Sequence, residues 1–182
     1  MDYLRLPLRK ASQNRIINDI DIFDRAGDFD KIKKTIMMNY KKAPQFETVY
    51  ALLEEIFAYP ADDLIGFLEH QIRCVCRYLD IDTEIYRSSA IPYEEGLKAE
   101  ERIIGICKEL GCTEYYNAIG GQELYNREHF TAEGMKLWFL KADFQEYSQG
   151  LESFEPGLSI IDVMMFNPKE TVKDMLKQFT LV

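Results

Sequence analysis

Residues 83–140 alternate between strand-like and helix-like patterns, and this order constrains the fold more than any other feature of the sequence. "TEIYR" and "TEYYNAI" predict strands over 83–87 and 113–119, and "MKLWFL" predicts a third over 135–140. Apolar residues at helical spacing fill 95–110, and a shorter helical piece covers 122–133. A strand–helix–strand–helix–strand order predicts parallel strands joined by crossovers.

The rest of the chain adds strands at its start and helices on both sides of this region. Alternating apolar residues in "DYLRLPL" and "RIINDIDIF" predict two strands of the same sheet. Helices are expected over "FDKIKKTIMMNY" with Asp28 as its cap, over "PQFETVYALLEEIFAY", from Asp62 onward, and over "NPKETVKDMLKQF". The prediction is one α/β domain over residues 1–182: three layers, Rossmann-like, with a mainly parallel sheet flanked by helices.

The net charge of -9 bears on the partners of the protein. An acidic chain repels phosphate backbones and anionic lipid surfaces, so nucleic acid is not an expected partner. No apolar stretch is long enough to span a membrane, and the start resembles a strand rather than a signal peptide, which predicts a cytoplasmic protein. An exposed apolar helix face would allow an oligomer, although the sequence does not identify the helix.

Neither a metal nor another cofactor is expected. Cys74, Cys76, Cys107 and Cys112 lack the spacing of a zinc or redox motif, and neither histidine has a partner at metal-binding spacing. His129 is a candidate acid or base, but an ordinary surface histidine is the favoured interpretation because no nucleophile accompanies it.

Polar loops follow each predicted strand of the alternating region. In open parallel sheets, ligands bind beyond the carboxyl ends of the strands. We therefore expect a crevice for a small-molecule substrate bordered by the loops after residues 87, 119 and 140. The predicted ligand-binding residues are Gly120, Gly121, Ser88, Ser89, Tyr125 and Asp143, with Lys10 and Gln13 as anion contacts.

Structural alternatives accompany these candidates. Gly120 and Gly121 either bring the backbone close to an anion, with the positive φ that glycine allows, or form a tight strand-to-helix turn. For Ser89, a cap of the next helix or turn is favoured over ligand binding. Asp162 is a polar residue within an apolar run, but the Ser-x-x-Asp spacing from Ser159 favours a helix start over a catalytic role.

Four stretches in order, "LPLRKASQNRIINDIDI", "KTIMMNYKKAPQF", "ERIIGICKELGCTEYYNAIGGQELY" and "FEPGLSIIDVMMFN", resemble the WbqC-like family. The last stretch is the most specific. The resemblance implies a bacterial protein associated with O-antigen or another surface polysaccharide. It also implies a further segment rich in proline and aromatic residues ahead of "YLRLPL". Because the sequence opens at Met1-Asp2-Tyr3, we expect either a truncated start or a shorter member of the family.

Two functions follow from the resemblance. One is a cytoplasmic transferase acting on a sugar or nucleotide-sugar precursor in O-antigen biosynthesis. The other is a non-catalytic ligand-binding or assembly protein of the same pathway, which the absence of a recognisable catalytic constellation favours. No catalytic residue is assigned from the sequence.

Overall fold

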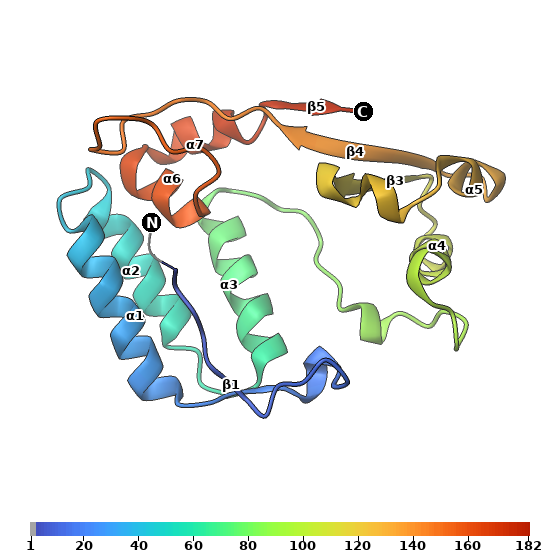
Figure 1. The fold of residues 1–182 in the computed structure, drawn as a ribbon, viewed down its shortest axis with the longest axis horizontal. Coiled ribbons are helices and arrows are strands. Elements are labelled where there is room, and N and C mark those ends of the chain that lie inside the picture. The colour runs from blue at the N-terminus through green and yellow to red at the C-terminus, as the bar shows by residue number, and fades with distance from the viewer. Residues whose placement is uncertain (1–2) are drawn as a thin grey trace. The chain divides into compact units, whose positions relative to one another are not determined.

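The computed structural model describes residues 3–182, and their contacts divide the chain into two compact units (Figure 1). Unit 1 consists of Met1–Asp82 and Glu146–Met175. Unit 2 consists of Thr83–Gln145 and Leu176–Val182. The expectation of a single domain stays a prediction, because two groups of contacts can still unfold as one.

Unit 1 is a helical assembly. Its three long helices are α1 (Arg25–Tyr40), α2 (Phe46–Phe57) and α3 (Leu64–Tyr78), and the short helices α6 (Ile160–Phe166) and α7 (Lys169–Met175) lie across one end of them (Figure 1). These elements enclose one apolar core whose fully buried members include Ile22, Ile36, Val49, Met164 and Val172.

Aspartates begin two of the long helices. Asp63 Oδ1 accepts a hydrogen bond from the Gly66 amide at 2.6 Å, so α3 starts within two residues of the predicted position. The predicted cap of α1 is wrong: Asp24 caps the helix by accepting from the Gly27 amide, and Asp28 lies buried in its first turn.

The two N-terminal strands are much shorter than predicted and form a separate ladder. β1 (Leu8–Arg9) pairs antiparallel with β2 (Asp21–Ile22), and the 3-10 turn η1 (Ile17–Asp19) precedes β2. Of the apolar residues in "RIINDIDIF", only Ile20 and Ile22 are buried, whereas Ile16 and Ile17 are exposed. The expected joining of these strands to the main sheet is therefore wrong.

Unit 2 contains a three-stranded sheet in the order β3–β4–β5. β3 (Glu114–Ala118) runs parallel to β4 (Lys136–Ala142), and β5 (Phe179–Leu181) pairs antiparallel with the far edge of β4. The 3-10 turns η2 (Ser88–Ala90) and η3 (Ile119–Leu124) and the helices α4 (Ala99–Glu109) and α5 (Arg127–Ala132) complete the unit. Its core consists of Ile104, Cys107, Phe130, Met135, Leu137 and Phe139.

The predicted three-layer, mainly parallel, Rossmann-like sheet is wrong. Residues 3–182 contain sheets of only two and three strands, with one parallel pair. Residues 83–87 form no strand, since Ile85 alone is partly buried there. β4 buries Leu137 and Phe139 but exposes Lys136 and Leu140, the alternation of a strand packed mainly on one face. The predicted C-terminal helix stops at Met175, and Phe179 lies in β5 instead.

Replacing Phe130 with alanine tests the core of unit 2. The Phe130 side chain is fully buried and stacks on Tyr115 with 5.6 Å between ring centroids, so Phe130→Ala should cost about 3–5 kcal/mol of unfolding free energy. Phe144→Ala is the matched control, because Phe144 is 64% exposed and its loss should cost no more than about 0.5 kcal/mol. Denaturant titration measures both, and equal losses would contradict the assigned core.

Candidate functional site

A buried carboxylate on helix α6 is the starting point of the candidate site in unit 1. Helix α6 begins after Ser159, whose hydroxyl accepts from the Ile161 amide at 3.3 Å, as the sequence predicted. Asp162 lies in the first turn of this helix and is only 4% exposed. Its carboxylate makes contacts away from its own helix, so it does more than begin α6.

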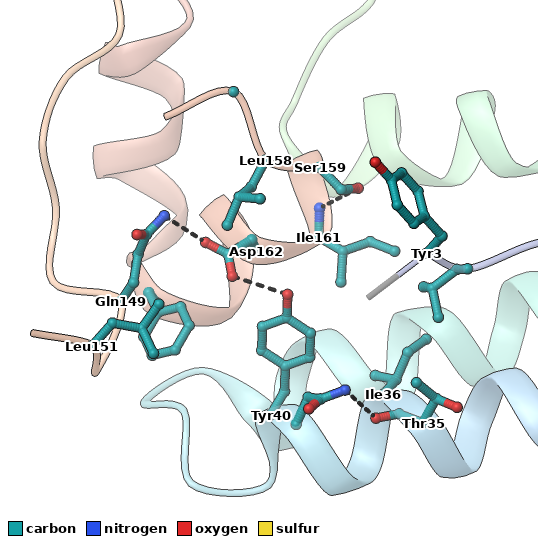
Figure 2. Close-up of a pocket in the computed structure, with 14 residues that line it drawn as sticks. Tyr3, Thr35, Ile36, Tyr40, Gln149, Leu151, Leu158, Ser159, Ile161 and Asp162 are labelled. Atoms are coloured by element: carbon teal, nitrogen blue, oxygen red, sulfur yellow. Dashed lines mark hydrogen bonds between the residues drawn. The ribbon is translucent and has the colours of Figure 1, made fainter. Parts of the chain in front are cut away.

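Three donors from other parts of unit 1 hold this carboxylate. Tyr40, the last residue of α1, donates its hydroxyl to Asp162 Oδ1 at 2.9 Å. Tyr147 donates to Oδ2 at 2.7 Å, and Gln149 Nε2 donates to the same oxygen at 3.2 Å. Figure 2 shows Tyr40 and Gln149 reaching Asp162 from different sides. Charge-assisted hydrogen bonds of this kind offset the cost of burying a carboxylate.

Backbone contacts fix the orientation of Gln149. Its Oε1 accepts from the Glu155 amide at 2.8 Å, and its Nε2 donates to the Glu155 carbonyl at 3.0 Å. Nε2 also lies 3.2 Å from the Tyr147 hydroxyl. Because both ends of the amide are engaged, the nitrogen is directed at Asp162 and the segment from 147 to 155 closes into a loop around it.

Asp162 borders a pocket of about 570 Å³ within unit 1 (Figure 2). This volume lies in the range of about 300–1,000 Å³ that is usual for small-molecule sites. Gly157 forms part of the wall with a φ of 73°, a conformation that glycine adopts without strain. The lining residues are Tyr3, Leu4, Thr35, Ile36, Asn39, Tyr40, Gln149, Leu151, Gly157, Leu158, Ser159, Ile161, Asp162 and Phe166.

The two tyrosines keep their protons over the physiological pH range. Burial, followed by the hydrogen bond to Asp162, raises the pKa of Tyr147 to about 12. The same two causes raise the pKa of Tyr40 well above its ordinary value. Both hydroxyls therefore remain donors to Asp162. The Tyr147 oxygen already accepts from Gln149 Nε2, whereas the oxygen of Tyr40, which lines the pocket, can still accept a hydrogen bond from a ligand.

Asp162 Oδ1 can accept one more hydrogen bond. A carboxylate offers about four lone-pair positions, two on each oxygen. Tyr147 and Gln149 occupy Oδ2, whereas within residues 3–182 only Tyr40 donates to Oδ1. The pocket thus presents a buried acceptor, and its wall also includes the apolar side chains of Ile36, Leu158 and Phe166.

The ligand-binding residues predicted from the sequence fall in both units. Ser88, Ser89, Gly120, Gly121, Tyr125 and Asp143 belong to unit 2, whereas Lys10 and Gln13 lie in the turn between β1 and β2 of unit 1. The ligand-binding role of these eight residues stays a prediction. Several of them contact residues outside the predicted set.

Within unit 2, three of these side chains contact residues outside the predicted set. The Ser88 hydroxyl accepts from Arg102 at 3.4 Å. Tyr125 packs edge-on against Tyr115 with 5.9 Å between ring centroids. Asp143 Oδ2 accepts from the Thr180 hydroxyl of β5 at 3.0 Å. Each contact ties a loop to the body of the unit.

Gly120 and Gly121 lie within η3, and neither has the positive φ that was expected. Gly121 is buried, and a Cβ atom there would lie 2.7 Å from the Asn117 side chain. Gly120 is exposed and has open space around its Cα. Gly121 is therefore required for close packing at the end of β3, while Gly120 faces solvent.

His129 has a partner that the sequence did not reveal. Its Nδ1 contacts Glu100 Oε1, and Glu100 Oε2 accepts from the Asn126 amide at 2.6 Å. Asn126 in turn caps α5 by accepting from the Glu128 amide at 2.8 Å. The histidine and glutamate thereby join α4 to the start of α5.

The cysteines, the possible metal ligands and the longest helices bear on metal binding and membrane insertion. The four cysteines are free thiols. Across residues 3–182, no group of three or more histidine, cysteine, aspartate or glutamate side chains is placed to hold a metal ion. In the same range, no helix has the length and apolar character needed to cross a bilayer.

The sequence singles out Asp162 as an unusual residue but does not predict its hydrogen-bond partners. The signal was present, because Asp162 is the single charged residue in the apolar run from Leu158 to Phe166. The predicted helix start at Ser159 is correct, but it does not account for the contacts that the Asp162 carboxylate makes. Tyr40 lies 122 residues away in sequence, and only tertiary packing brings it there.

Comparison with known proteins adds one family and one relative. The profile of the WbqC-like protein family matches residues 1–174. The chain is 24% identical over 146 residues to a protein of Mycobacterium tuberculosis described as "Uncharacterized protein Rv1507c". That match covers 79% of this chain and 62% of the relative, so the chain spans less than two thirds of its length. No solved structure matches.

Substitution of the two glycines separates packing from ligand contact. Gly121→Val should lower the melting temperature, because its side chain must displace Asn117 from its contact with the Ala118 amide. Gly120→Ala should leave the melting temperature within error, since open space surrounds it. Thermal unfolding of both variants measures this. A fully stable Gly121→Val protein would contradict the packing role.

The raised pKa of Tyr147 predicts a loss of stability at high pH. Its stabilising contribution is complete below about pH 10, the unfolded-state value, and disappears as the pH rises through about 12. The stability difference between wild type and Tyr147→Phe should therefore shrink over this interval. Denaturant titrations at several pH values measure the difference. A gap that stays constant up to pH 12 would argue against the assigned hydrogen bond.

Proposed function

Because the chain belongs to the WbqC-like protein family, we propose that it acts on a sugar or nucleotide-sugar precursor of a bacterial surface polysaccharide such as O-antigen, and that the unit 1 pocket holds the sugar. The proposed activity is that of a cytoplasmic transferase. The observation that carries the proposal is Asp162, a buried carboxylate with one open acceptor position at the wall of a ligand-sized pocket.

The lining of the pocket suits a pyranose. Sugar hydroxyls both donate and accept, and the pocket offers them a carboxylate, the tyrosine oxygen of Tyr40 and the hydroxyl of Ser159. The C–H faces of a sugar are apolar, and Ile36, Leu158 and Phe166 supply apolar surface in the same pocket. Tyr40 packs edge-on against Phe166 at 6.0 Å, which restricts the motion of both rings.

Asp162 gives this site a chemical role beyond binding. A sugar hydroxyl or amine that donates to Oδ1 can pass a proton to the carboxylate while its oxygen or nitrogen forms a bond to the transferred group. The donor molecule departs with the electrons of the bond that breaks, so Asp162 would act as a general base. Tyr40 and Tyr147 hold the carboxylate in one position. The phosphates of a nucleotide-sugar would lie outside this pocket, because its lining within residues 3–182 includes no lysine, arginine or histidine.

The alternative function is a non-catalytic ligand-binding or assembly protein of the same pathway. One observation favours it: three neutral donors already engage the Asp162 carboxylate. A carboxylate held in this way is well suited to recognise a ligand without exchanging protons with it. In this case the bound sugar would leave the protein unchanged.

Thermal-shift measurements test the proposal directly. Nucleotide-sugars and their parent sugars should raise the melting temperature, and a ligand at a hundred times its Kd adds about 2.7 kcal/mol. The nucleotides alone should have no effect. Asp162→Asn should weaken the response. Asp30→Asn is the matched control, because it removes the same charge from an exposed position of α1.

Two outcomes would decide against parts of the proposal. A panel that produces no shift in wild type, or an equal shift in Asp162→Asn, would remove the pocket as the sugar site. Mass spectrometry of a stabilising ligand after incubation with the protein and host extract separates the two functions. A transferase consumes the ligand, and a binding protein returns it intact.

A further inference from the structure

The charge of Asp162 has no counter-charge in its pocket. Its three donors are two tyrosine hydroxyls and a glutamine amide, all of which are neutral. Elsewhere in unit 1, carboxylates such as Asp80 are paired with lysines, in that case Lys169 and Lys173. Buried carboxylates are normally paired with a cation, and Asp162 departs from this rule.

The position left open on Asp162 suits a cation that donates hydrogen bonds. A primary ammonium group carries three donors and no acceptor. One donor can reach Oδ1, and a second can reach the hydroxyl oxygen of Tyr40, which already lies 2.9 Å from Oδ1. Tyr40 itself lines the pocket, so both acceptors are within reach of one group.

A second feature of the pocket points the same way. Within the described chain, Asp162 is the sole ionisable group of full charge that lines it, and the other polar lining residues are Thr35, Asn39, Gln149 and Ser159 along with the tyrosines. A phosphate or carboxylate entering this space would meet a like charge and no cation. A neutral hydroxyl would leave the negative charge uncompensated. An ammonium group compensates it.

We propose that the unit 1 pocket is specific for an amino sugar, whose primary ammonium group pairs with Asp162 Oδ1 and the Tyr40 hydroxyl oxygen. This inference rests on the proposed function and narrows its substrate to one chemical class. An N-acetylated sugar lacks the charge and carries a bulkier group at the same position, so it is discriminated against along with the unmodified sugar.

Matched sugars that differ at a single substituent test the proposal. The probes are glucosamine, galactosamine and mannosamine, each compared with its hydroxyl and N-acetyl counterparts. Binding to the full chain is measured by calorimetry and by ligand-observed NMR. For at least one of the three, the amine should bind roughly tenfold or more tightly than both counterparts, because charge-assisted hydrogen bonds are about twice as strong as neutral ones.

Two variants assign the preference to the proposed contact. Asp162→Asn should reduce the amine to the affinity of the hydroxyl sugar, since it removes the charge while keeping the shape. Tyr147→Phe removes a donor to Asp162 without changing the charge, so the preference for the amine should remain. Asp30→Asn, in which an exposed charge is removed, should behave as wild type. Circular dichroism and thermal unfolding confirm that each variant is folded.

The outcomes distinguish this inference from the proposed function. If hydroxyl or N-acetyl sugars bind at Asp162 as tightly as the amines, the amine specificity is overturned and the sugar site stands. If the amine preference survives Asp162→Asn in a folded protein, the assigned contact is wrong. If no sugar of either kind binds while the protein is folded, the sugar site and the amine inference fail together.

Discussion

The hydrogen bonds to Asp162 hold together the part of unit 1 that contains the pocket. They join the end of α1, the segment around 147–149 and the start of α6. Hydrogen bonds to a charged group contribute about 1.5–3 kcal/mol each, whereas the same carboxylate without its donors would be strongly destabilising. The polar cluster therefore fixes where these three segments meet, and the pocket forms beside that point.

The position of this cluster changes where a ligand is expected. The rule that ligands bind beyond the carboxyl ends of parallel strands requires an extended parallel sheet. Residues 3–182 contain one parallel pair, β3 with β4, so they offer no extended parallel sheet to which the rule would apply. The best-formed polar site of unit 1 lies instead among helices, where side chains from α1 and α6 converge (Figure 2).

Sequence reasoning succeeded where the signal was local. The β3–α5–β4 order, the start of α3 and the Ser159 cap follow from periodicity and capping chemistry over a few residues. It failed where neighbours distant in the chain decide the outcome. Phe179 continues an apolar helical face in sequence, but pairing with Ala142 draws it into a strand. Residues 83–87 have strand-like composition, yet they belong to neither sheet of the described chain.

The sequence by itself determined the family, the helical segments and the presence of a single charged residue, Asp162, in the apolar run before Phe166. Only the tertiary structure decided what that charge does. A helix start and a buried carboxylate at a pocket wall have the same local pattern, since both place Asp162 three residues after Ser159. The difference lies in Tyr40, Tyr147 and Gln149, whose donors surround the carboxylate once the chain has packed. Periodicity and capping rules describe neighbours along the chain, and these contacts are made across it.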